Sequence, residues 1–275
     1  MRSLLRVASK PGAAGAPLPP VFTRFEEFGI KPRRGQVTMI VAPPNGGKSF
    51  LALYWVVRLV EREGMTGLYF SADTDDFTMK LRATAILTGE HMADIETDLL
   101  RGRGRKYHDV LAKLTPLRFD FEPDPTYQHM AEEIQAFEEA WGDYPQIIVV
   151  DNLMNVVSEN ENEWSGMKEV TKALHRIARQ TGAAVFVLHH MNESDVKDPR
   201  FPAPRKAVAG KVNQLPEVIL SLGFDSTYGR LRVAKVKDRN GRHDPSGEEY
   251  VEVFADVARG AIYESKWARD EGRAA

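Results

Sequence analysis

Residues 42 to 49 read Ala-Pro-Pro-Asn-Gly-Gly-Lys-Ser, and no other segment restricts the fold of this chain as strongly. They lie between an apolar, strand-like run at 37–41 and a helix-like run at 50–57. The segment matches the template G-x-x-x-x-G-K-[ST], with Ala42 in place of the first glycine. Glycines let successive backbone N–H groups surround an anion, and the following helix points its positive end at that anion. The sequence therefore predicts a phosphate-binding loop, and a Gly-rich turn without a ligand is the less favoured alternative.

The template also assigns chemistry to single positions. Lys48 is expected to reach the β- and γ-phosphates of a nucleotide, and the hydroxyl of Ser49 is expected to bind Mg²⁺. We therefore expect ATP and Mg²⁺ as cofactors. The predicted nucleotide-binding residues are Pro44, Asn45, Gly46, Gly47, Lys48, Ser49 and Phe50.

Composition excludes several classes of protein. The 275 residues are 43% apolar and 28% charged, as in an ordinary globular protein, and they include no cysteine. Disulfide frameworks and thiolate metal sites are thereby excluded, and with no secretory signal we expect a cytoplasmic protein. No apolar run approaches the roughly 20 residues of a membrane span. The net charge of −2 gives no overall attraction to nucleic acid, so such binding must come from local clusters.

Strand-like and helix-like runs alternate from residue 36 onward, which predicts an α/β fold with a mostly parallel central sheet flanked by helices. The alternation stops after residue 217, so antiparallel strands are expected at the C-terminal end. We expect a flexible N-terminal arm at 1–20, one domain at 21–265 and a poorly ordered tail at 266–275; the arm could instead contact a neighbouring subunit or DNA. The predicted strands lie near 37–42, 67–72, 117–121, 147–151, 183–188, 217–222, 230–236 and 249–255. The predicted helices lie at 48–63, 75–88, 127–141 and 165–180.

Two strand-like runs end in acids, and doubly wound sheets bind ligands at the carboxyl ends of their strands. Asp151 ends one such run and is the Walker B candidate, which holds Mg²⁺ through water or together with Ser49. Because Asn152 follows it, the acid that positions the attacking water must come from another strand. Asp73, at the end of the run 67–73, is the candidate catalytic base. The alternative is that these acids only cap the turn or helix that follows them.

Together with the phosphate loop, four segments resemble the RecA-type ATPase core of the DnaB- and RepA-like hexameric helicases of phages and plasmids. The resemblance implies a RecA-like P-loop fold and a homo-oligomer, expected to be a hexamer, with ATP sites at subunit interfaces. Asp73 takes the place of the family's usual catalytic Glu. The segments that carry the resemblance are 68–73, 147–153, 184–192 and 234–241.

The same resemblance assigns two further roles. His190 matches the polar sensor at the end of a central strand, with His189 beside it, and only one of two successive side chains can face the site. Lys237 and Arg239 match the pair that family members insert into the neighbouring subunit's ATP site, with Arg239 as the arginine finger. Lys235 competes for the lysine role. The alternative is that these cations line the solvated face of an antiparallel strand.

In that family, loops after the Walker B strand and the sensor strand line a central channel for single-stranded DNA. The first, at 158–166, carries Glu159, Glu161 and Glu163 and is a poor binder of phosphates. The second loop, at 192–211, is basic and is expected to be mobile, which suits the tracking of a phosphate backbone. Its candidate DNA contacts are Lys197, Arg200, Arg205, Lys206 and Lys211. The dense basic block at 101–106 is either an accessory patch or a solvated turn.

The function predicted from these features is an ATP-hydrolysing, ring-forming motor on single-stranded DNA, in replication or recombination. A recombination factor of the RecA or RadA type, which coats DNA without unwinding it, is a second interpretation of the same fold. A third is a P-loop phosphotransferase, or a nucleotide-gated regulator with no DNA ligand. The pair Lys237 and Arg239 favours an oligomer over a monomeric kinase.

Overall fold

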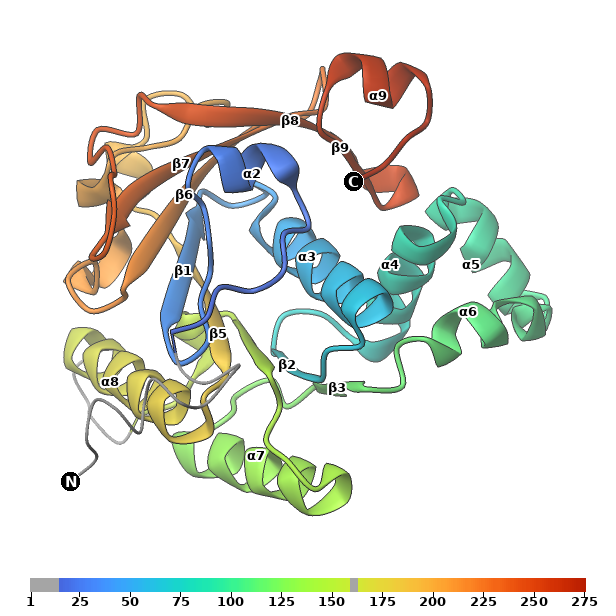
Figure 1. Ribbon diagram of the computed structural model, residues 1–275, viewed down its shortest axis with the longest axis horizontal. Coiled ribbons are helices and arrows are strands. Elements are labelled where there is room, and N and C mark those ends of the chain that lie inside the picture. The colour runs from blue at the N-terminus through green and yellow to red at the C-terminus, as the bar shows by residue number, and fades with distance from the viewer. Residues whose placement is uncertain (1–14, 159–162) are drawn as a thin grey trace.

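The computed structural model describes residues 15–158 and 163–275, which fold around one mixed sheet (Figure 1). Within these residues the sheet has nine strands in the order β3-β2-β4-β5-β1-β6-β7-β8-β9. Strands β1 to β6 pair in parallel, and β6 to β9 pair antiparallel. The predicted fold class is therefore confirmed. The strands are β1 (Val37–Ala42), β2 (Gly67–Ser71), β3 (Leu117–Asp120), β4 (Ile147–Asp151), β5 (Ala184–His190), β6 (Val218–Asp225), β7 (Arg230–Asp238), β8 (Tyr250–Asp256) and β9 (Ala261–Tyr263).

Helices cover both faces of the sheet (Figure 1). One face packs against α2, α3 and α4, and the other packs against α7 and α8. Because both faces are covered, β1 and β4 are buried along their whole length, which explains why they read as unbroken apolar runs. The helices are α2 (Thr23–Glu27), α3 (Lys48–Glu63), α4 (Asp76–Thr88), α5 (Met92–Leu100), α6 (His108–Ala112), α7 (Tyr127–Trp141), α8 (Glu163–Thr181) and α9 (Lys266–Asp270). Within the described ranges, none of them has the length and apolar character that crossing a membrane requires.

The parallel strands give the sheet two distinct edges. Their last residues, Ala42, Ser71, Asp151, His190 and Asp225, lie at one edge, which we call the carboxyl edge. The opposite edge, where these strands begin, is the amino edge. Strand β7 runs the other way, so it begins at the carboxyl edge and ends at the amino edge.

Several short elements were not predicted. Helices α5 and α6 follow α4 and pack on it through a small cluster around Ile95 and Tyr107. The tail at 266–275 contains α9, and the backbone N–H of Ala275 donates a hydrogen bond to the carbonyl of Ile262. Of the expected N-terminal arm, residues 1–14 lie outside the described residues, while Pro17 forms an isolated bridge with Arg33. Short elements of this kind depend on contacts with the main core, and periodicity does not show them.

Candidate nucleotide-binding site

The phosphate loop connects β1 to α3 at the carboxyl edge. Gly47 adopts φ 81° directly before Lys48, the first residue of α3, and such a positive φ favours glycine. A Cβ on Gly46 would lie 2.7 Å from the Cβ of Ala42 and 2.9 Å from the carbonyl oxygen of Pro43. Gly46 is therefore required by packing, because the methyl group of Ala42 already occupies that space.

A cavity of about 280 Å³ opens above this loop. Asn45 to Phe50 line it as predicted from the sequence, whereas Pro44 does not. Arg82 of α4 is a further polar residue of its wall, and apolar side chains close another side. Sequence patterns gave no signal for these wall residues, because they come from elements far from the loop in the chain: Thr74, Arg82, Met92, Phe224, Val257 and Gly260.

Ser49 and Asp151 meet beside the loop. The Ser49 hydroxyl donates to Asp151 Oδ1 over 3.2 Å, and the hydroxyl of the fully buried Tyr69 donates to Oδ2 over 3.0 Å. Burial raises the pKa of Asp151, which is 2% exposed, although these hydrogen bonds and Lys48 oppose the rise. Burial also lowers the pKa of Lys48, and the charges of Asp151 and Asp73 oppose that change. A hydroxyl and a carboxylate are the oxygen ligands that Mg²⁺ takes, so the pair fits this ion.

Asp73 belongs to a second polar group at the same edge. It is exposed just beyond β2, and its Oδ2 accepts a 2.7 Å hydrogen bond from the side-chain amide of Asn152. The same amide nitrogen lies 3.4 Å from Nε2 of His190 at the end of β5. The structure thus brings Asp73 and His190 to one place. No role for Asn152 was predicted, although it is a polar residue directly after a buried strand that ends in an acid, and this was the available signal.

The two histidines of β5 face opposite ways, as alternation along a strand requires. His190 is partly exposed on the side of Asn152, and its pKa is lowered by burial and then by the charge of Lys48. His189 is fully buried, and its Nε2 contacts the carbonyl oxygen of Ala209 at 3.0 Å. Of the two, His190 is therefore the imidazole that faces Asp73.

Burial lowers the pKa of His189 to about 4, and this predicts acid-sensitive folding. The unfolded chain binds a proton at this residue near its ordinary pKa of about 6.5, so stability is full above that pH and falls as pH drops toward 4. We expect His189 to contribute a loss of about 2 kcal/mol in unfolding free energy between pH 7 and pH 5. Urea denaturation at both pH values should show that loss reduced in His189→Gln and retained in His243→Gln, which changes an exposed histidine. Equal losses in all three proteins would contradict this assignment.

Lys237 and Arg239 lie at the end of β7, at the amino edge. The ammonium of Lys237 donates to the carbonyls of Asn213 and Gln214 at 3.0 and 2.7 Å, and burial lowers its pKa to about 8. The Arg239 guanidinium donates to the carbonyls of Gln214 and Leu215 at 3.0 and 2.8 Å, and its side chain is 46% exposed. The solvated-face alternative is wrong for the lysines, because Lys235 and Lys237 are only 6% and 7% exposed.

A β-bulge separates the two lysines. The pairing of β6 with β7 shifts between Ile219 and Leu220, so Lys237 is opposite Ile219 and Lys235 is opposite Leu220. Adjacent strand residues point to opposite faces, and the extra residue of the bulge therefore turns the lysines to opposite faces as well. Lys235 reaches the carbonyl of Gly29 and Asp238, on the side of α2, at 2.8 and 2.9 Å. Lys237 alone shares the face of Arg239.

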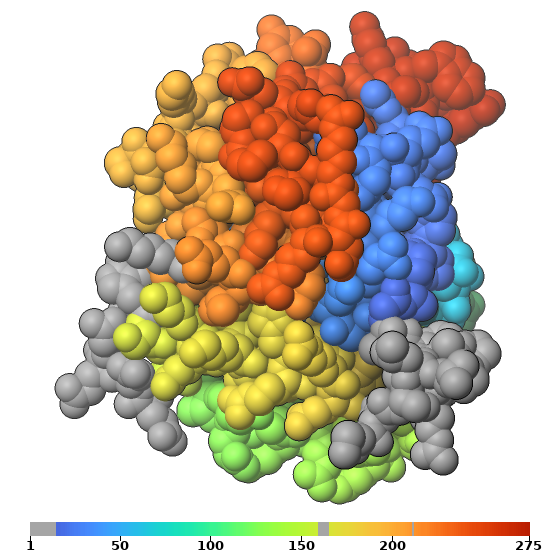
Figure 2. Space-filling view, turned by 60° about the vertical axis from the view of Figure 1, so that its left-hand side comes forward, coloured from blue at the N-terminus to red at the C-terminus, as the bar shows by residue number. Residues whose placement is uncertain are grey.

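The basic loop after β5 is folded back across the sheet. Arg205 N–H donates to the carbonyl of Pro245, Phe224 N–H to that of Pro199, and the Ser221 hydroxyl to that of Ala203. Figure 2 shows this segment, in gold, beside the orange-red turn near residue 245. The expected mobile loop is thus fastened to β6 and to the turn before β8.

The candidate DNA contacts in this loop are not equivalent. Arg200 forms a 2.7 Å ion pair with Asp198, which offsets its charge. Lys197 and Lys206 are exposed, Arg205 is half-buried, and the side chain of Lys211 lies outside the described part of the structure. In the acidic loop after β4, Glu159 and Glu161 lie outside the described residues, as does the side chain of Glu163.

Two of the four basic side chains in the block at 101–106 form ion pairs with carboxylates that precede it. Arg103 contacts Asp98, and Lys106 contacts both Asp98 and Glu90. These carboxylates raise the pKa of Lys106 and neutralise much of the local charge. The pairing favours the interpretation of this block as a solvated turn.

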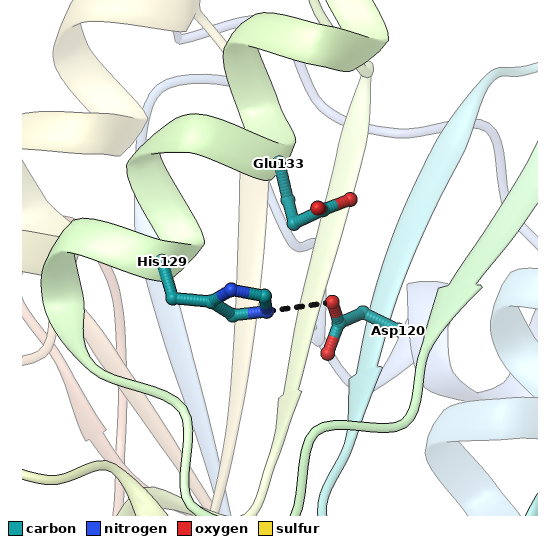
Figure 3. A group of neighbouring side chains, drawn as sticks. All are labelled: Asp120, His129 and Glu133. Atoms are coloured by element: carbon teal, nitrogen blue, oxygen red, sulfur yellow. Dashed lines mark hydrogen bonds and ion pairs between the residues drawn. The ribbon is translucent and has the colours of Figure 1, made fainter.

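A further polar cluster joins β3 to α7 (Figure 3). Asp120, His129 and Glu133 offer ligand atoms within 4.8 Å of one another. His129 Nε2 lies 2.8 Å from Asp120 Oδ2, and none of the three lines the phosphate-loop cavity. The contact between His129 and Asp120 fastens the first turn of α7 to the end of β3.

Known proteins resemble this chain in sequence and in fold. A family model described as an AAA domain matches residues 14–195. The gene 65 protein of Mycobacterium phage L5 is 33% identical over 253 residues, which cover 88% of this chain and 91% of that protein. The replicative DNA helicase DnaB of Leifsonia xyli subsp. xyli is 24% identical over 246 residues, which cover 82% of this chain and 52% of the helicase.

Among solved structures, a DnaB-like replicative helicase superposes with a TM-score of 0.75 at 15% identity, covering 90% of this chain and 61% of the helicase chain. The resemblance predicted from the sequence is thereby confirmed. The chain belongs to the AAA domain family, and its fold is that of the RecA-like ATPase domains of DnaB-like helicases.

Proposed function

We propose that this protein is a ring-forming motor that hydrolyses ATP and acts on single-stranded DNA in replication or recombination. The observation that supports the proposal most directly is the placement of Lys48 and Arg239 at opposite edges of one sheet. Asp238 pairs with Val218, and Val218 is next to Thr38 at the start of β1. The phosphate loop begins four residues later, beyond Ala42, which at about 3.3 Å per residue is roughly 13 Å along the sheet.

In an oligomer, the amino edge of one subunit can lie against the carboxyl edge of the next, which would bring the Arg239 of one chain close to the phosphate loop of another. Neither Lys237 nor Arg239 at the end of β7 can reach the phosphate loop of its own chain. The half-exposed Arg239 is available to a neighbour whose carboxyl edge faces it, with the buried Lys237 behind it. Repeating such a head-to-tail contact closes a ring when the rotation permits. An arginine supplied in trans stabilises the charge that develops on the transferred phosphoryl group.

The remaining groups divide the chemistry of hydrolysis. Backbone N–H groups of the loop and the Lys48 ammonium hold the β- and γ-phosphates, and Ser49 with Asp151 would hold Mg²⁺. That ion neutralises charge on the phosphate oxygens when bound. Asp73 accepts the proton of the attacking water, and His190 senses the γ-phosphate from the neighbouring strand.

DNA would contact the basic loop after β5. Lys197 and Lys206 are exposed on this loop, and Arg205 lies close enough to Lys237 to lower its pKa. We therefore expect phosphate contacts from this face of the ring.

The function is tested by the rate of phosphate release at saturating MgATP, with and without a poly-dT oligonucleotide, over a range of protein concentrations. A shared-site motor should show a specific activity that rises with protein concentration and rises further with DNA. A rate per chain that is independent of both would refute the motor and favour a phosphotransferase. Coating of DNA with ATPase activity but no unwinding of a forked duplex would identify the recombination factor.

The proposed DNA contacts of the basic loop after β5 can be tested by charge reversal. Reversing two charges with Arg205→Glu and Lys206→Glu should weaken binding of poly-dT about 10-fold or more at 50 mM salt, because two phosphate contacts become repulsive. The slope of log affinity against log salt should become smaller by about 1.4. Fluorescence anisotropy measures both quantities.

A matched control carries Arg62→Glu and Arg179→Glu, which reverse exposed charges in the last turns of α3 and α8, at the amino edge. This variant should bind like the wild type. Equal effects in both variants would mean that DNA contacts lie elsewhere or that attraction is nonspecific.

A further inference from the structure

Asn152 occupies a central position between the predicted base and the predicted sensor. Its side chain is buried, with only 3% of the residue exposed. The amide oxygen accepts a 2.7 Å hydrogen bond from the backbone N–H of Met154, in the 3₁₀ turn Leu153–Asn155. Because a backbone N–H only donates, this contact fixes which end of the amide is oxygen.

The amide nitrogen therefore points the other way, toward Asp73 and His190. Its 2.7 Å hydrogen bond to Asp73 Oδ2 is donated to a carboxylate, which makes it a charge-assisted bond. Its second neighbour, Nε2 of His190 at 3.4 Å, must present a lone pair, because an amide nitrogen has only protons to offer. Such a lone pair requires the neutral form of the imidazole, and burial and then the charge of Lys48 favour that form by lowering the pKa of His190.

We propose that Asn152 is a positioning residue that orients the carboxylate of Asp73 for water activation and holds His190 as its Nδ1–H tautomer. The proposal rests on the ATPase activity proposed above and adds a residue to it. Asp73 is exposed just beyond the end of β2, so without this bond its carboxylate would rotate freely in solvent. The side-chain amide of Asn152 thus orients the carboxylate of Asp73 and also contacts His190 at the end of β5.

The first test is the steady-state kinetics of Asn152→Ala. We expect kcat to fall about 10- to 100-fold, the usual cost of a misplaced reacting group. KM for ATP should stay within about twofold, because Asn152 is absent from the cavity wall. Asn155→Ala is the matched control, since this residue belongs to the same turn but its side chain contacts neither Asp73 nor His190, and its kcat should match the wild type.

The second variant separates orientation from folding. Asn152→Asp keeps an oxygen for the Met154 N–H, but it can donate to Asp73 only when its own carboxyl is protonated. At pH 8 its kcat should therefore fall as far as that of Asn152→Ala. If Asn152 served only to hold its own turn, Asn152→Asp would instead retain most of the wild-type kcat.

Long-range ¹H–¹⁵N spectra give a readout that does not depend on turnover. The wild type should show His190 as the Nδ1–H tautomer and His189, whose Nε2 faces the Ala209 carbonyl, as the Nε2–H tautomer. Asn152→Ala should remove the preference at His190 and leave His189 unchanged.

Three results would overturn the inference: a kcat of Asn152→Ala within twofold of an active wild type, a kcat of Asn152→Asp within twofold of it, or an Nε2–H tautomer at His190. A wild type without ATPase activity would instead remove the proposed function. In that case the tautomer spectra would still decide whether Asn152 holds His190 as described.

Discussion

Lys48→Ala is expected to reduce ATP hydrolysis at least 1000-fold, to background, because in the proposed site its ammonium is the loop cation next to the γ-phosphate. Lys48 is nearly buried, beside Asp151 and Asp73, so no other cation of the described residues takes its place in the loop. Removing it leaves two carboxylates facing the phosphates, and nucleotide binding should weaken as well. Phosphate release at saturating MgATP and binding of a fluorescent ATP analogue measure the two effects.

Lys80→Ala is the control for this substitution. Lys80 is an exposed lysine on α4, and it does not line the cavity. Its loss should leave the rate unchanged. Turnover of Lys48→Ala at more than a few per cent of the wild-type rate would remove the assignment of the phosphate loop as the catalytic site.

Arg239→Ala is expected to slow turnover roughly 1000-fold while leaving the affinity for ATP nearly intact. In the proposed shared site the guanidinium would stabilise charge that develops during phosphoryl transfer, so its loss should appear in kcat and not in binding. Among the described residues, the polar partners of its half-exposed side chain are the carbonyls of Gln214 and Leu215 and, at 3.9 Å, a carboxylate oxygen of Glu217. Folding should therefore be little affected. Arg242→Ala, which removes an 83%-exposed side chain paired with Glu249 near the same turn, should behave like the wild type.

Mixing two inactive variants tests whether the site is shared. Neither Lys48→Ala nor Arg239→Ala should hydrolyse ATP alone. In a mixed ring, a subunit carrying Arg239→Ala still offers an intact phosphate loop, and a neighbour carrying Lys48→Ala offers an intact arginine. Such a mixture should regain a measurable fraction of wild-type activity, whereas two halves of a site within one chain would give none at any ratio.

Local signals predicted the central part of the fold well. Helix α3 begins after Gly47 and ends before Gly64, both with positive φ, and these glycines allowed the range 48–63 to be predicted from the sequence. Strands β1 and β4 are covered on both faces, so their apolar runs stand out against the flanking polar residues. Asp151 and Ser49 lie together, as the strand-end argument indicates.

Features that depend on pairing between distant segments could not be predicted. The bulge that turns Lys235 away from Lys237 follows from the register of β7 on β6, whereas a spacing of two residues normally implies one shared face. The folding of the basic loop onto Pro245 and Ser221 needs partners far along the chain. From the sequence, Asn152 shows only that no acid follows Asp151. Its proposed role could not be predicted, because it depends on Asp73 and His190 lying close together in the fold.

The unbroken hydrogen bonding from β1 through β6 to β7 also has a mechanical consequence. A sheet covered on both faces resists shear, so the phosphate loop and the basic pair of one chain keep a fixed spacing. In the proposed ring, closure of one subunit's phosphate loop on nucleotide would therefore turn its basic pair by the same rotation against the next subunit. Each subunit would then act as a rigid body that transmits the state of one nucleotide site to the following one.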